Sequence, residues 1–145
     1  MAKTLRTEIG IDASKEKVWG ILTDFVSYPE WNPFIKRIAG EPREGTKLDV
    51  SIQPPGSKGV TLRPKVLSAE SGKELKWLGH LLGVRGIFDG EHHFLIHEQS
   101  SGHVRFVQEE VFGGVLVPFT GKQLEKTKEG FEKMNQALKK RAEEI

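Results

Sequence analysis

The sequence has no cysteine, which excludes disulfide bonds, thiolate chemistry and cysteine-ligated zinc. It also has no apolar run that approaches the roughly 20 residues needed to span a bilayer, so we expect no stable membrane insertion. Residues 1–12 lack the hydrophobic stretch of a secretory signal. Together these absences make a cytoplasmic protein the expectation.

A cluster of one-signed charge is also missing. The 22 lysines and arginines are balanced by 20 acidic residues, which gives a formal net charge of +2. Charges gather at residues 125–145, but there both signs are mixed, as on a solvated helix face. Because nucleic-acid binding requires a basic patch, we expect no nucleic-acid partner.

Signatures of common enzyme classes are absent as well. The glycines of "GGVLVPFTGK" do not have the spacing of a phosphate-binding loop, and no G-x-S-x-G nucleophile motif occurs. We therefore expect no cofactor. Any catalysis would have to use side chains in a shaped apolar pocket.

The chain length suits a single domain over residues 1–145, since a domain of this size buries roughly 68–70% of its unfolded surface. Alternating apolar residues predict a strand at residues 4–11. Ser14 is then a favourable N-cap for a helix with one apolar face.

The stretch "YPEWNPFI" at residues 28–35 concentrates aromatic side chains around two prolines. Because proline lacks an amide hydrogen and pushes the preceding residue toward extended geometry, we predict a short, broken helical segment that leads into a strand at residues 35–39. Two interpretations of Trp31 and Phe34 are open: they fill the core, or they cover a cavity.

The middle of the chain reads as successive short strands with tight connections, which is typical of antiparallel hairpins. We expect one strand in each of "KLDVSIQ", "VTLRPKVLSAE", "LKWLGHL", "IFDGEHHFLIHE" and "HVRFVQEEVFG", which makes seven strands in all. A long helix with an apolar stripe follows at residues 118–145. Gly130 interrupts this helix at a cost of about 1 kcal/mol, and we interpret it as making room for a ligand. The fold class is α+β.

This order of elements is the helix-grip layout, and several stretches resemble the START-like superfamily, in particular its polyketide cyclase/dehydrase family 2 branch. The stretches are "VWGILTDFVSYPEWNPFI", "LRPKVL", "ELKWLG", "FDGEHHF", "EEVFGGVLVP" and "GFEKMNQALKKRAE". The resemblance implies a curved, seven-stranded antiparallel sheet wrapped around the C-terminal helix, with a cavity between them. It also implies that residues 28–35 border the mouth of that cavity.

Strand alternation indicates which side chains face the interior. In one strand Phe88, His92 and Phe94 share the apolar face. In the next, Phe106, Gln108, Glu110 and Phe112 share a face that the resemblance also turns inward. The turn "QSSG" implies paired positions that sum to about 200–202, so His92 lies opposite Gln108 or Glu110. The same arithmetic places Trp77 near Gly90 or His92.

His92 and Glu110 are the candidate catalytic pair. A carboxylate beside a histidine is suited to abstract a proton in an aldol-type cyclisation or a dehydration. The alternative is a hydrogen-bonded pair that orients a ligand or stabilises the sheet. Arg63 faces either inward, where it would bind an anionic group, or toward solvent. The five histidines are too dispersed over both strand faces to share an ion, so we expect no metal site.

The leading functional hypothesis is a binding protein for a small hydrophobic or amphipathic molecule, such as a lipid, a polyketide or an isoprenoid-like compound. The alternatives are a cofactor-independent cyclase or dehydratase that uses His92 and Glu110, and a protein-interaction role with a filled core. A homodimer formed through an edge strand or "VFGGVLVPF" is a further expectation. The candidate ligand-binding residues are Trp31, Phe34, Arg63, Trp77, Phe88, His92, Phe94, Gln108, Glu110, Phe112, Phe131 and Met134.

Overall fold

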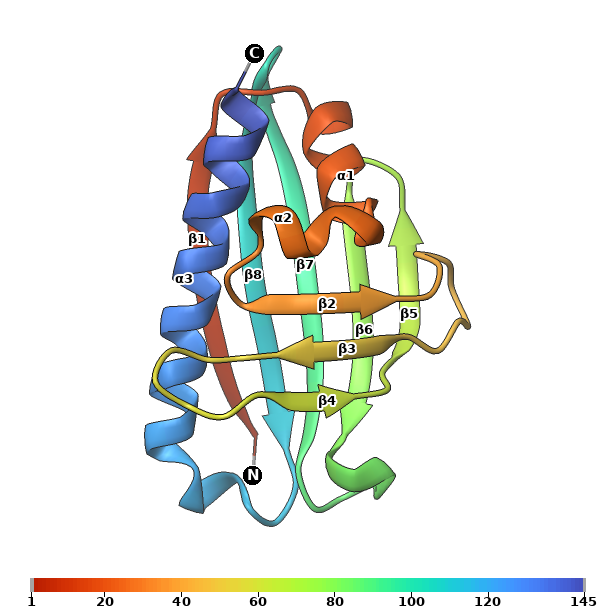
Figure 1. Ribbon diagram of the computed structural model, residues 1–145, viewed down its shortest axis with the longest axis vertical. Coiled ribbons are helices and arrows are strands. Elements are labelled where there is room, and N and C mark those ends of the chain that lie inside the picture. The colour runs from red at the N-terminus through yellow and green to blue at the C-terminus, as the bar shows by residue number, and fades with distance from the viewer. Residues whose placement is uncertain (1, 145) are drawn as a thin grey trace.

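The computed structural model describes residues 2–144, and within that range eight strands form two antiparallel sheets (Figure 1). The larger sheet has the order β1-β8-β7-β6-β5, and the smaller has the order β2-β3-β4. The bounds of the larger sheet's strands are β1 Lys3–Ile11, β5 Lys65–Glu70, β6 Glu74–His80, β7 Asp89–Ser100 and β8 His103–Gly113. Those of the smaller are β2 Ile35–Ala39, β3 Asp49–Ile52 and β4 Val60–Leu62.

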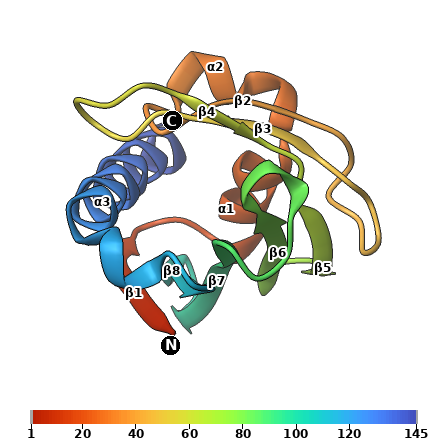
Figure 2. The same cartoon turned by 90° about the horizontal axis from the view of Figure 1, so that it is seen from below.

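Three α-helices complete the described chain: α1 at Lys15–Thr23, α2 at Tyr28–Trp31 and α3 at Gly121–Glu143. Short 3₁₀ turns lie at Phe25–Ser27 (η1), Leu81–Gly83 (η2) and Val117–Phe119 (η3). Seen from below, α3, the larger sheet and the smaller sheet surround a common interior (Figure 2). The α+β helix-grip fold is thus confirmed. No helix within residues 2–144 is both long and apolar enough to cross a bilayer.

The expected number of seven strands is wrong, and Pro64 explains the difference. The run "VTLRPKVLSAE" forms two strands, β4 and β5, which belong to different sheets. Proline cannot donate to a strand ladder, so pairing stops where the chain passes from one sheet to the other. The carbonyl of Pro64 instead accepts from the amide of Leu48 at 2.9 Å.

The helix cap and the strand bounds predicted in the first third of the chain are confirmed. Ser14 caps α1 by accepting a hydrogen bond from the Lys17 amide at 3.1 Å, and β2 has the predicted bounds. Asn32 supports the turn into β2, since its Oδ1 accepts from the amides of Phe34 and Ile35 at 2.9 and 2.8 Å. The prolines therefore act together with a side-chain cap to redirect the chain.

Sheet register also agrees with the hairpin arithmetic. His92 pairs directly with Glu110, and Trp77 pairs with His92, so three neighbouring strands present these side chains to the interior. From the opposite side α3 buries a stripe that fills the core. Its buried apolar members are Leu124, Phe131, Met134, Leu138 and Ala142.

Candidate functional site

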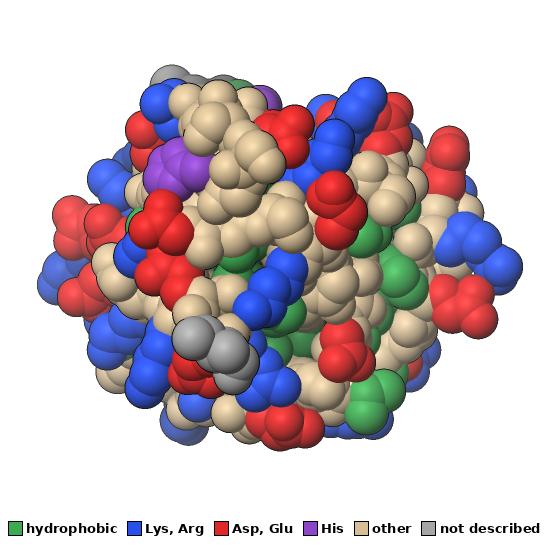
Figure 3. Space-filling model, turned by 90° about the horizontal axis from the view of Figure 1, so that it is seen from above, with side chains coloured by type: hydrophobic (Ala, Val, Ile, Leu, Met, Phe, Trp, Pro, Cys, Tyr) green, Lys and Arg blue, Asp and Glu red, His purple; other side chains and the backbone are tan. Residues whose placement is uncertain are grey.

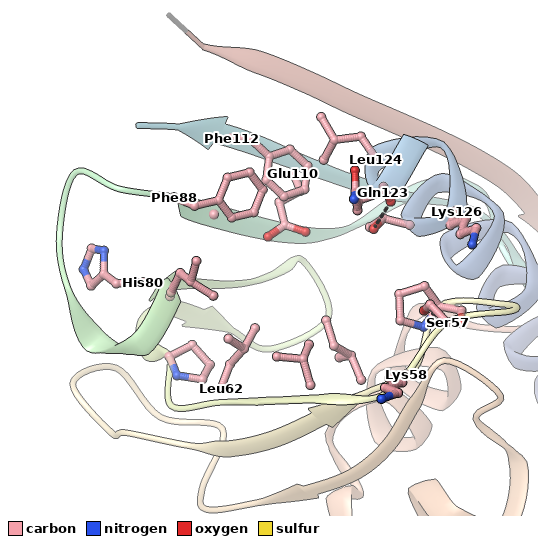
Figure 4. Close-up of a pocket in the computed structure, with 18 of the residues that line it drawn as sticks. Ser57, Lys58, Leu62, His80, Phe88, Glu110, Phe112, Gln123, Leu124 and Lys126 are labelled. Carbon is pink, nitrogen blue, oxygen red and sulfur yellow. Dashed lines mark hydrogen bonds between the residues drawn. The ribbon is translucent and has the colours of Figure 1, made fainter. Parts of the chain in front are cut away.

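A pocket of about 470 Å³ lies between the inner face of β6–β8, the β3–β4 hairpin and the first turns of α3 (Figure 4). Its wall is mainly apolar, and the largest side chains are aromatic. Phe88 and Phe112 stack with ring centroids 5.4 Å apart and form one side together with Trp77. The hairpin supplies the facing aliphatic side: Ile52, Pro54, Val60, Leu62 and Pro64.

Glu110 is the acidic side chain in this wall. Its carboxylate projects from β8 into the pocket beneath Phe112 (Figure 4), and the side chain is only 15% exposed. Gly90 makes this position available, because a Cβ there would overlap Oε2 of Glu110. The absence of a side chain at residue 90 therefore places an acceptor group against an apolar cavity.

Behind Glu110, a chain of polar groups crosses the core. Nδ1 of His92 lies 3.3 Å from Oε1 of Glu110, and its Nε2 lies 3.0 Å from Oε1 of Gln108. Gln108 then donates to Oδ1 of Asn135 at 2.7 Å, and Asn135 donates to Oγ1 of Thr7 at 2.9 Å. The network joins the pocket wall to α3 and β1, and its members behind Glu110 are all buried.

The direction of these hydrogen bonds determines the histidine tautomer. Nε2 of Gln108 also lies 3.2 Å from the carbonyl oxygen of Phe131, and a carbonyl only accepts. The amide nitrogen of Gln108 must face that carbonyl, so its oxygen faces His92 and Nε2 of His92 must donate. With Nε2 donating to Gln108, Nδ1 is the ring nitrogen of His92 that faces Oε1 of Glu110, at 3.3 Å.

Aromatic rings hold the imidazole of His92 in place. Phe94 stacks on it with centroids 4.2 Å apart, and Phe131 and Trp77 lie at 4.8 and 5.5 Å. His92 is itself buried and does not belong to the pocket wall. It contacts the pocket through Glu110.

Three lysines surround the pocket on the side of the β3–β4 hairpin and α3. Lys58, Lys122 and Lys126 belong to its lining, and all three are exposed. None forms an ion pair with a described residue; Lys126 has only a long contact, 3.5 Å, to the carbonyl of Gly56. The pocket therefore has an apolar interior, one inner carboxylate and a cationic rim.

A comparison with protein families matches residues 2–143 to the family described as polyketide cyclase / dehydrase and lipid transport. The chain belongs to this family. The resemblance inferred from the sequence is therefore confirmed over nearly the whole chain. No curated protein matches the chain in sequence.

The chain is also similar in fold to several solved structures. A START superfamily protein from Mycobacterium smegmatis is 20% identical with a TM-score of 0.75, covering 97% of each chain. Norcoclaurine synthase from Thalictrum flavum is 16% identical with a TM-score of 0.78, covering 100% of this chain and 96% of that one. The Zhui aromatase/cyclase from Streptomyces sp. R1128 is 12% identical with a TM-score of 0.75, covering 99% and 94%. At these identities the likeness concerns the fold alone.

In this member of the polyketide cyclase / dehydrase and lipid transport family, only part of the predicted ligand-binding set lines the pocket. The structure brings together Trp77, Phe88, Glu110 and Phe112. His92 and Gln108 lie behind Glu110 in the buried network. Arg63 points away, because it is exposed and pairs with Asp49 at 3.0 Å.

The remaining predicted residues belong to the core instead of the pocket wall. Phe34 packs edge-on against Phe131 with centroids 5.6 Å apart, and Phe94 and Met134 are fully buried. Trp31 packs against Tyr28, whose hydroxyl donates to the carbonyl of Leu22. Tyr28, Phe34 and Ile35 of this segment are buried in the core, Trp31 is half-buried against it, and none of them lines this pocket.

Gly130 also has a different role from the one expected. A Cβ at this position would overlap the ring of Phe34, with Cε1 only 2.6 Å away. The glycine makes room for a core phenylalanine and not for a ligand. This contact between residues far apart in the sequence has no signature in helical periodicity.

Sequence reasoning missed the lysine rim and the hairpin wall. Val60 and Leu62 looked like ordinary strand residues, Lys58 fell in a connection between predicted strands, and Lys126 belonged to the mixed-charge stretch interpreted as a solvated helix face. Thr127, which interrupts the apolar stripe of α3 with a hydroxyl, was the one available signal, and it does line the pocket. Within the described chain no group of three His, Asp or Glu side chains is placed to hold a metal ion.

Proposed function

We propose that the protein binds a small amphipathic molecule, of lipid, polyketide or isoprenoid-like character, in the pocket between β6–β8, the β3–β4 hairpin and α3. The observation that carries the proposal is the pocket itself. Its volume of about 470 Å³ lies within the range of roughly 300–1,000 Å³ typical of ligand sites, and few polar groups interrupt its apolar wall.

The distribution of charge orients the ligand. Its apolar part packs against Phe88, Phe112 and Trp77, while an anionic group meets the exposed Lys58, Lys122 and Lys126. A hydroxyl or other donor on the inner part would hydrogen-bond to Glu110. We therefore expect amphipathic anions to bind better than alcohols or amines of the same chain length.

Native mass spectrometry of the freshly purified protein is the first test, since a bound molecule adds a mass that disappears on denaturation. Calorimetric titration with dodecanoate, dodecanol and dodecylamine then measures the head-group preference. Thr127→Trp fills the pocket and should abolish binding, whereas Lys128→Trp on the exposed side of α3 should not. Equal binding by both variants would locate the ligand elsewhere and refute the proposal.

The role of the lysine rim has its own matched control. Changing Lys58, Lys122 and Lys126 to glutamine should weaken dodecanoate binding and leave dodecanol binding unchanged. The same change at Lys128, Lys133 and Lys140 removes equal charge from exposed positions outside the pocket, none of them in an ion pair with a described residue. If both triple variants lose the same affinity, general electrostatic attraction and not the rim is responsible.

A cofactor-independent cyclase or dehydratase is the second candidate function, and the Glu110–His92 contact favours it. A carboxylate that faces an apolar pocket and is backed by a histidine is suited to remove a proton next to a carbonyl. Glu110→Gln should lower turnover of a poly-β-ketone substrate by about 10²–10⁴-fold while ligand binding survives. Glu109→Gln, on the outer face of the same strand, is the control; unchanged turnover in Glu110→Gln would exclude this chemistry.

A further inference from the structure

Large exposed apolar side chains gather at one end of the molecule. Among residues 2–144 nine such side chains are exposed, and six of them lie in two loops, the one between β6 and β7 and the one between β8 and α3. The six form what we call the end patch: Leu82, Val84, Ile87, Val115, Leu116 and Phe119. Leu82 and Phe119 are 90% and 79% exposed, so they contribute nothing to the core.

The two loops form one surface because they are bonded to each other. The amide of Val115 donates to the carbonyl of Gly86 at 3.1 Å, and that of Leu116 donates to Ile87 at 3.0 Å. Gly114 allows this approach, since its φ is +109° and a Cβ there would lie 2.5 Å from the Ile87 carbonyl oxygen. The backbone thus holds exposed apolar side chains together on one surface, and such patches mark interaction sites.

The exposed charges around the end patch are positive. Arg85 and Lys122 are exposed, whereas the nearest acid, Asp89, is half-buried and is bonded to His80 and to the amide of Gly86. At the opposite end of the molecule, positive and negative side chains are mixed over the surface (Figure 3). The end patch is therefore the place where exposed apolar groups and exposed cations coincide.

We propose that the end patch docks on the surface of a lipid bilayer that carries anionic headgroups. The apolar side chains would enter the boundary between headgroups and acyl chains, and Arg85 and Lys122 would lie against the anionic lipids. The charge argues against a second copy of this chain as the occupant, because a symmetric contact through the patch would bring like charges together. Lys122 also belongs to the pocket rim, and Leu81 and Phe88 join the loop between β6 and β7 to the pocket wall. The docked protein would therefore hold its pocket beside the membrane.

Vesicle co-sedimentation tests the proposal directly. The unmodified protein should bind vesicles made of equal parts phosphatidylglycerol and phosphatidylcholine, and bind pure phosphatidylcholine far less. Replacing Leu82, Val115 and Phe119 by serine should abolish binding. The matched control replaces Val26 and Leu67, which are exposed apolar residues outside the patch, and it should bind like the unmodified protein.

Arg85→Gln tests the charge. Near an anionic surface one cation contributes about 1 kcal/mol, so binding should fall about fivefold, and added salt should reduce the difference. Lys36→Gln, at an exposed lysine on β2, is the control. Dodecanoate binding in the serine variant should be unchanged, which separates this proposal from the proposed function of the pocket.

Two results would overturn the inference. One is equal vesicle binding by the serine variant and by the control. The other is no vesicle binding, combined with a concentration-dependent dimer in light scattering that the serine variant abolishes; the patch would then be a contact between copies of this chain.

Discussion

Phe34 and Gly130 form one fitted contact: the ring of Phe34 lies where a side chain at Gly130 would be. Phe34 comes from the segment that follows α2, and Gly130 from the middle of α3, so the contact joins two elements that nearly one hundred residues of chain separate. Phe131 packs edge-on against the same ring and fixes its orientation. The glycine that weakens α3 locally is thus required by packing.

Gly130→Ala should therefore destabilise the protein although it improves helix propensity. Overpacking a core typically costs about 1–3 kcal/mol, which offsets or exceeds the gain of about 1 kcal/mol from replacing a helical glycine. Gly20→Ala in α1 is the control, because a Cβ there meets nothing within 4 Å, and it should raise the free energy of unfolding. Urea denaturation measures both. In a Phe34→Leu background the penalty of Gly130→Ala should shrink, and an unchanged penalty would show that the ring is not its cause.

Gln108→Leu should cost about 2–3 kcal/mol of unfolding free energy, since it leaves buried polar groups of His92 and Asn135 without partners. Gln99→Leu, at an exposed position near the β7–β8 turn, should change stability by no more than about 0.5 kcal/mol. Chemical denaturation measures the free energy of unfolding of both variants. Similar small effects in both would mean that the network contributes little.

His92 should carry a proton on Nε2 in every folded state, because Nε2 must donate to Gln108. Nitrogen-15 chemical shifts and ring couplings of labelled histidine distinguish the tautomers. We expect the Nε2–H form or the doubly protonated ring, and we expect this restriction to relax in Gln108→Leu. A neutral ring protonated only at Nδ1 would contradict the deduced direction of the hydrogen bonds.

Asp89 should give the loop between β6 and β7 a stability that depends on pH. Partial burial raises the pKa of Asp89, but hydrogen bonds from His80 and the Gly86 amide, together with the charges of His80 and Arg85, outweigh it and hold the pKa below the ordinary 3.8. A lowered folded-state pKa means that the stabilisation is complete above about pH 4 and is lost as the pH falls through the folded value.

Hydrogen exchange of the Gly86 amide is the appropriate measurement, because that amide donates to Asp89 at 3.0 Å. Protection should decrease as the pH is lowered below about 4, after correction for the intrinsic exchange rate. In Asp89→Asn the protection should be lower at neutral pH and lose this dependence. Protection that is equal in both proteins at neutral pH would show that the carboxylate does not hold the loop.

Local patterns in the sequence predicted most of the fold. Alternation gave the inward face of β7, and the family resemblance turned the matching face of β8 inward. The turn "QSSG" limited His92 to a position opposite Gln108 or Glu110, and His92 does pair with Glu110. The Ser14 cap and the start of β2 were also predictable. These features depend on interactions between residues that are close in sequence or directly paired across a hairpin, where the period of two or 3.6 residues carries the information.

Tertiary structure alone decided which inward side chains meet each other and which leave space. Phe34 is packed into the core and Trp31 is half-buried against it, and the pocket lies beside the β3–β4 hairpin instead. Periodicity assigns a side chain to a face and says nothing of its distance to the next layer. That distance is determined by the break at Pro64, which sends β4 and β5 into different sheets, and by the contact of Phe34 with Gly130 on α3.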